Sequence, residues 1–219
     1  MLFGLVISTL AWCSVQIFID KLFGSKWEIL TYGLFGCSVP RIIEYHFYQN
    51  PHLLTFLECG KEGLTDFERT FLIFCTGYFA FDIFLGIRLR DPWHMQLHHF
   101  IAFSVVITPL YYECCVFEIL VCLWIGEFSA PCAFWIFRYE KEPEIYNSKP
   151  MLVVKIIYFI LFVILRFGVG SYALWRFFNS TETLLIIKLG CLLMTAFNCV
   201  VFKQSIDEIK GYFVKKKDH

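Results

Sequence analysis

The segment Phe71–Ile87, FLIFCTGYFAFDIFLGI, decides the class of fold, because Asp82 is its sole charged residue. A helix needs roughly 20 mostly apolar residues to cross the hydrocarbon core of a bilayer. Comparable apolar runs occur at residues 2–19, 100–112 and 116–137. The whole chain is 58% hydrophobic and only 17% charged, whereas a soluble domain carries about a quarter charged residues. The sequence therefore predicts an all-α, multi-pass membrane protein.

Seven segments are predicted to cross the membrane and to form one transmembrane helical bundle. The second segment is the weakest candidate, because Pro40, Arg41 and Glu44 interrupt it. Without that segment the bundle has six spans. The seven segments are residues 2–19, 29–47, 70–88, 95–112, 115–137, 151–175 and 183–203.

The chain is predicted to be a single domain over residues 1–219, with a core at about residues 30–205 and a basic tail at residues 206–219. Lysine and arginine gather in alternate loops and in the tail, which predicts a cytosolic C-terminus. Lys216 and Lys217 match the dilysine signal by which coat proteins return membrane proteins to the endoplasmic reticulum. The alternative is a plain positively charged tail that only sets the orientation.

Four ionisable side chains are expected at membrane depth: Asp82, His98, His99 and Glu127. Charged groups are unfavourable in hydrocarbon, so each is a candidate functional residue. Asp82 precedes Arg88 by six residues, which places it about 9 Å inside the membrane at 1.5 Å per residue. We expect the four side chains to face one cavity in the same half of the bundle.

Two interpretations of this group stay open. A carboxylate beside an imidazole orients the ring and raises its basicity, which suits a general base or a ligand site. Alternatively, the pairs are structural hydrogen bonds between helices. A zinc ion held by two histidines and a carboxylate is a further alternative, but six histidines are too few for a di-iron histidine-box site. We therefore assign no metal site.

Three further residues in the last spans bear on the cavity. Pro131 lies four residues after Glu127 and has no N–H to bond the Glu127 carbonyl, so a kink is predicted there. Arg166 and Lys155 are candidate partners for carboxylates, although both side chains are long enough to reach the membrane interface. We favour the interface for Lys155.

The order of these residues resembles the TLC (TRAM/LAG/CLN-type) domain family. Asp82 ends one span, His98 and His99 open the next, and Trp124–Pro131 (WIGEFSAP) leads to Arg138. Family members outside the ceramide synthases show a similar acidic residue, a histidine pair and an E-x-S-x-P segment followed by an arginine. The resemblance covers about residues 30–205. The H-D-x-x-D segment of ceramide synthases is missing, so the non-ceramide-synthase branch is the better match.

The resemblance implies roles for particular residues. Ser129, Pro131 and Arg138 belong to the family segment and are candidate lipid-binding residues. By likeness to ceramide synthases, His98 and His99 would act as general acid or base in acyl transfer.

Three functions are expected. The first is a role in lipid homeostasis in the endoplasmic reticulum, through binding of sphingolipid or phospholipid or through control of membrane lipid composition. The second is an acyl-CoA-dependent N- or O-acyltransferase that uses the histidine pair with Asp82 or Glu127 and needs no cofactor besides the co-substrate. The third is a cargo-sorting receptor that cycles to the Golgi and binds coat proteins through its tail. The zero formal net charge gives no reason to expect a nucleic acid partner.

Overall fold

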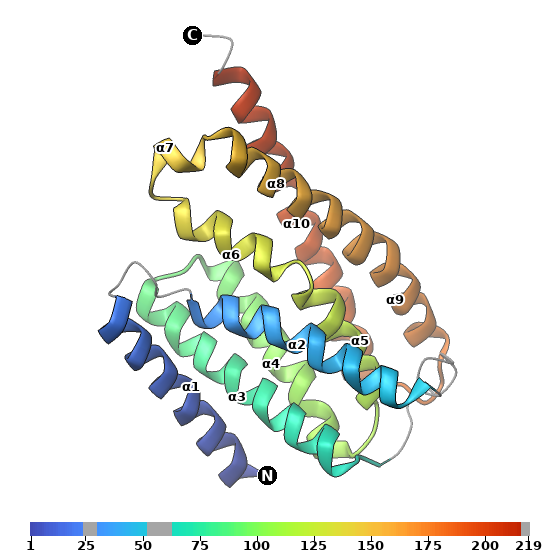
Figure 1. Ribbon diagram of the computed structural model, residues 1–219. Coiled ribbons are helices and arrows are strands. Elements are labelled where there is room, and N and C mark those ends of the chain that lie inside the picture. Colours follow the sequence, from blue (N-terminus) through green and yellow to red (C-terminus); the bar gives the residue numbers. More distant parts are fainter. Residues whose placement is uncertain (24–29, 52–62, 216–219) are drawn as a thin grey trace.

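Every regular element of the described chain is a helix, as Figure 1 shows. The computed structural model describes residues 1–23, 30–51 and 63–215. The predicted all-α architecture is confirmed for these residues. In chain order the helices are α1 (Leu2–Phe23), α2 (Leu30–Gln49), α3 (Asp66–Leu89), α4 (Trp93–Tyr112), α5 (Val116–Glu127), α6 (Ala130–Tyr139), α7 (Pro143–Tyr146), α8 (Lys149–Phe162), the π-helical η3 (Val163–Val169), α9 (Gly170–Asn179) and α10 (Leu185–Lys215).

Helices occupy all seven predicted positions, but they differ in how apolar they are. Within the described residues, α1, α3, the continuous stretch Lys149–Asn179 and α10 are long and apolar enough to cross a membrane. A fifth span results if α5 and α6 are one bent helix. Hydropathy thus supports four or five spans against the seven predicted. The reason is that polar side chains interrupt α2 and the start of α4.

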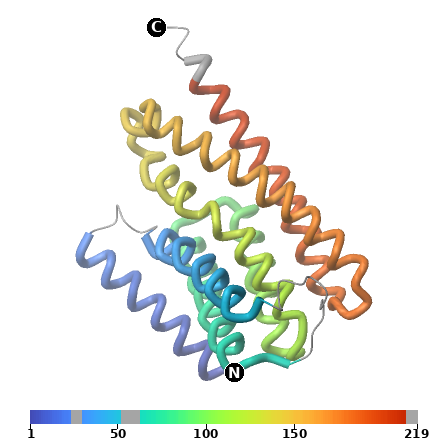
Figure 2. Tube along the Cα trace, turned by 45° about the vertical axis from the view of Figure 1, so that its right-hand side comes forward, coloured from blue at the N-terminus to red at the C-terminus, as the bar shows by residue number. Residues whose placement is uncertain are grey.

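The bundle has a helix pair or helix group at each of two edges, and helices from both halves of the chain in its centre. Figures 1 and 2 show α1 packed along α3 at one edge, and the α8–α9 rod beside α10 at the other. Helix α4 joins the two edges, since it contacts both α3 and α10. Helix α5 lies between them and packs on α2 and α9. The two halves of the chain therefore meet around α4 and α5.

Local signals set the ends of α3, the helix that carries Asp82. The Thr65 hydroxyl accepts a hydrogen bond from the Glu68 N–H (3.2 Å), and the Glu68 carboxylate accepts one from the Thr65 N–H (2.8 Å). This reciprocal capping box satisfies donors that the first turn leaves free. At the other end Arg90 adopts a left-handed conformation (φ 58°). Pro92 follows, so the chain leaves α3 and enters α4 within a few residues.

The predicted kink after Glu127 is confirmed. Helix α5 ends at Glu127, α6 begins at Ala130, and the two helix axes differ by 40°. Pro131 lies in the first turn of α6, where a missing N–H is tolerated. The break therefore leaves the backbone carbonyls near Glu127 available to other groups.

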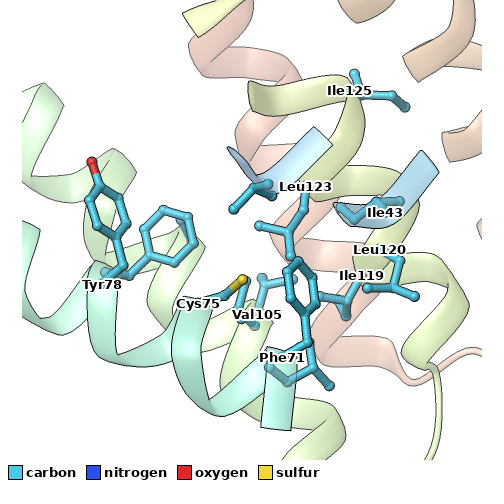
Figure 3. Packing of buried hydrophobic residues seen from close by; sticks show 14 of the residues in the cluster. Ile43, Phe71, Cys75, Tyr78, Val105, Ile119, Leu120, Leu123 and Ile125 are labelled. Carbon is cyan, nitrogen blue, oxygen red and sulfur yellow. The ribbon is translucent and has the colours of Figure 1, made fainter. Parts of the chain in front are cut away.

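Aromatic side chains fill the centre of the first half. The rings of Phe35 and Tyr78 are stacked, with centroids 3.6 Å apart, and the Trp12 ring meets Tyr78 edge-on at 5.1 Å. In Figure 3 the buried cluster continues through side chains of α3, α4 and α5, including Cys75, Val105 and Leu123. This packing fixes α3 and α4 against each other, and with them the residues predicted to be functional.

Candidate functional site

A cavity of about 110 Å³ lies inside the bundle, between α4, α5, η3, α9 and α10. Most of its wall is apolar. Five polar side chains also line it: His98, Glu127, Arg166, Thr195 and Asn198. At this polar end Arg166 of η3 donates hydrogen bonds to both α5 and α10. The opposite, apolar end is formed by residues such as Val106, Ile119, Phe177 and Gly190, which lie further along the same helices.

Arg166 is the cation of the polar end, and the π-helical segment η3 carries it into the cavity. Its Nη2 donates to the backbone carbonyl of Gly126 at 2.6 Å, and its Nη1 donates to Oδ1 of Asn198 at 3.2 Å. The break after α5 exposes that carbonyl. From the sequence, Arg166 was a candidate either to pair with a carboxylate or to reach the membrane interface, whereas both of these bonds go to neutral acceptors inside the bundle.

Glu127 lies on the other side of the same end. A Cβ atom built on Gly36 of α2 would be 3.6 Å from the Glu127 Oε2, so the carboxylate reaches α2 where that helix lacks a side chain. Glu127 also lines the cavity. The polar end therefore contains one guanidinium and one carboxylate.

The two adjacent histidines have different environments. The Nδ1 atom of His99 pairs with the Oδ2 atom of Asp82, and these side chains are only 13% and 12% exposed. The His98 ring is turned 82° from that of His99 and stacks on Phe197, with centroids 4.5 Å apart. Successive residues of a helix point about 100° apart. His99 therefore ties α4 to α3, whereas His98 lines the cavity.

A comparison with known families identifies the domain that contains this cavity. The family model described as TLC domain matches residues 25–204, which is most of the chain. The protein belongs to the TLC domain family. No curated protein and no solved structure matches the chain. The matched region contains Asp82, both histidines, Glu127 and Arg166, so the whole cavity lies within the TLC domain.

The TLC domain brings together only part of the predicted site. Of the four candidate catalytic residues, His98 and Glu127 line the cavity, while Asp82 and His99 form a pair beside it. Ser129, Pro131 and Arg138 are outside the cavity lining.

The three family-segment residues have local contacts. Ser129 is buried at the break between α5 and α6, and Pro131 lies in the first turn of α6. Arg138 donates to the Glu142 carboxylate at 2.9 Å and lies over the Tyr139 ring. Ser129 and Pro131 therefore lie at the bend, and Arg138 lies near the end of α6. The tail residues Lys216 and Lys217 lie outside the described residues.

Lys155 differs from its prediction. We expected it to extend to the membrane interface, but it is buried, and its Nζ atom lies 3.1 Å from the centroid of the Tyr146 ring. The turn around α7 brings Tyr146 back over α8, and its hydroxyl donates to Glu208 of α10 at 3.0 Å. Burial raises the pKa of Tyr146, and the charge of Glu208 raises it further. The ring thus offers Lys155 a partner that the sequence did not reveal.

Two features of the site were missed from the sequence. Asn198 and Thr195 are polar residues among apolar neighbours in α10. Their polarity in an apolar segment could have marked them in the sequence as candidate site residues. The thiols of Cys122 and Cys191 lie 3.5 Å apart in the cavity wall, which no sequence pattern predicts. Among residues 1–23, 30–51 and 63–215, no three His, Cys, Asp or Glu side chains are placed to hold a metal ion.

Proposed function

We propose that this TLC domain protein binds a membrane lipid in its cavity and takes part in lipid homeostasis in the endoplasmic reticulum. The observation that carries the proposal is the amphipathic cavity, which has an apolar wall and a polar end. Ligand sites commonly combine a mostly apolar lining with a few polar groups that fix orientation. A lipid chain suits the apolar part, and its head group suits the end with Arg166 and His98.

The proposal is tested by filling the cavity. Ala102 lines the cavity, whereas Ala196 is exposed on α10. We expect Ala102→Phe to reduce the amount of lipid that copurifies by about tenfold, as loss of about 1.4 kcal/mol of binding would do. Ala196→Phe adds the same volume outside the cavity and should leave the amount unchanged. Mass spectrometry of extracted lipids measures both, and an undiminished lipid signal in folded Ala102→Phe would contradict the proposal.

Acyl transfer is the second candidate, and the position of His98 favours it. An imidazole in the wall of a cavity that Glu127 also lines suits a general base. We expect transfer from acyl-CoA to sphingoid bases or lysolipids, with His98→Ala lowering the rate by at least about 100-fold. His99→Ala should also lower it, because His99 holds α4 against Asp82. Absence of turnover in the wild-type protein with every acceptor would leave lipid binding alone.

Location in the endoplasmic reticulum depends on the tail. We expect Lys216→Ser/Lys217→Ser to move the protein to later secretory compartments, because the dilysine signal is read by coat proteins. Lys203→Ser/Lys210→Ser removes the same charge from α10, upstream of the tail signal, and is the matched control. Fluorescence microscopy of tagged proteins gives the result. Unchanged location of the first variant would favour a tail that only sets orientation, and would also remove the basis for a cargo-sorting role.

A further inference from the structure

The size of the cavity limits what kind of lipid fits. The polar end lies at His98 on α4 and Asn198 on α10, and the apolar end lies at Val106 and Gly190 on the same helices. Eight residues separate the ends on each helix, which corresponds to about 12 Å. A cavity of about 110 Å³ drawn out over that length is narrow, which suits one extended alkyl chain better than two side by side.

The polar end has a fixed cation with spare donors. A guanidinium has five N–H donors, and the bonds to Gly126 and Asn198 occupy only part of them. Those two bonds hold the Arg166 side chain in place before any ligand binds. Among the described residues lining the cavity, Arg166 is the one permanent cation. A preorganised guanidinium is well suited to a planar carboxylate, which it binds through paired N–H groups.

Two buried nitrogen atoms point to a missing partner at this end. Within the described residues, neither Nε of Arg166 nor Nδ1 of His98 has a hydrogen-bond partner. Buried polar atoms are normally hydrogen-bonded, so such atoms call for an explanation. An oxygen atom of a ligand head group would supply the acceptor that the Nε–H lacks.

Glu127 restricts the charge of that head group. Its carboxyl group lines the same end as Arg166, so acidic oxygen atoms are already present there. A head group with two negative charges would be repelled more strongly by Glu127 than one with a single charge. An ammonium head group would instead be placed against Arg166. A single carboxylate fits this combination better than a phosphate or an amine.

We infer that the ligand is a single-chain lipid ending in a carboxylate, with the carboxylate on Arg166 and the chain extended toward Ile119 and Phe177. This inference rests on the proposed function, because it requires that the cavity bind lipid. It makes Arg166 the residue that determines head-group specificity.

A matched set of ligands tests the inference. Dodecanoate, dodecanol, dodecylamine and dodecyl phosphate share one chain and differ in head group, and a phospholipid with two dodecanoyl chains tests the chain number. Binding to the purified full-length protein is measured by competition with radiolabelled dodecanoate in detergent. We expect dodecanoate to bind at least about tenfold more tightly than the other four, as one charge-assisted hydrogen bond would allow.

Two variants and a control assign the preference to Arg166. Arg166→Gln should reduce dodecanoate binding to the level of dodecanol, while dodecanol binding stays the same. Asn198→Asp gives Arg166 a carboxylate partner within the protein and should weaken dodecanoate binding in the same way. This variant tests the inference even if Arg166→Gln does not fold. Arg176→Gln in α9, outside the cavity lining, should retain the wild-type preference.

The outcomes separate the two proposals. If none of the five ligands binds to folded wild-type protein, the proposed lipid binding fails and this inference fails with it. If they bind but dodecanol or dodecylamine binds as tightly as dodecanoate, only the carboxylate assignment is overturned. Equal binding of the two-chain phospholipid would overturn the single-chain assignment.

Discussion

Replacing Asp82 by alanine is expected to destabilise this TLC domain protein by about 3 kcal/mol, because it removes the carboxylate partner of the buried His99 imidazole. The carboxylate meets the His99 Nδ1 between α3 and α4, and both side chains are almost completely buried. Without Asp82, the imidazole loses its partner in an environment that offers little water. Thermal unfolding of the purified protein in detergent gives the measurement.

A double-mutant cycle measures how much Asp82 and His99 stabilise each other, apart from their contacts with other residues. Asp82→Asn keeps the size and a hydrogen-bonding oxygen, so it should destabilise less than Asp82→Ala. His99→Ala alone should also be destabilising, and the double variant should be less destabilised than the sum of the single variants. Strictly additive effects would mean that Asp82 and His99 do not stabilise each other.

Replacing Gly77 by valine is expected to destabilise the protein by about 1–3 kcal/mol through overpacking. Gly77 lies where α1 crosses α3, and a Cβ atom built there would be 3.0 Å from the backbone carbonyl carbon of Ser8. Backbone atoms of a helix cannot move aside as a flexible side chain can. We therefore expect α1 to be displaced from α3, with a lower unfolding temperature.

Gly168 supplies the matched control for this substitution. It is also a helical glycine, but a Cβ atom built on it would have no described atom within 4 Å outside its own turn. Gly168→Val should therefore leave the unfolding temperature close to that of the wild type. If Gly77→Val is as stable as Gly168→Val, then α1 does not depend on close contact at Gly77. Limited proteolysis of the α1–α2 connection gives a second readout of α1 displacement.

Sequence patterns predicted the helices well, because the causes are local. Apolar runs such as Phe71–Ile87 become helices since the backbone must satisfy its own hydrogen bonds in hydrocarbon. The bend after Glu127 was also predictable, because Pro131 lacks an N–H whatever surrounds it. The number of spans was less accurate, since the polar residues of α2 and α4 can be placed either in the bundle or at its surface.

The candidate site was predictable as a set of residues and not as an arrangement. Buried ionisable groups in apolar segments stand out in the sequence, and Asp82, His98, His99 and Glu127 were found in this way. Ser129, Pro131 and Arg138 lie close to Glu127 in the chain, but the bend takes them away from the cavity lining. Neighbours in sequence can face different helices on either side of a break.

The sequence by itself determined that this protein is an α-helical membrane bundle of the TLC domain family, with ionisable residues inside it. Only the tertiary structure decided that His99 binds Asp82 while His98 faces the cavity, and that Arg166 is held by Gly126 and Asn198. The physical reason is that a helix forms from contacts within a few residues. Which face of it meets a cavity depends on helices distant in the chain, whose packing no local pattern specifies.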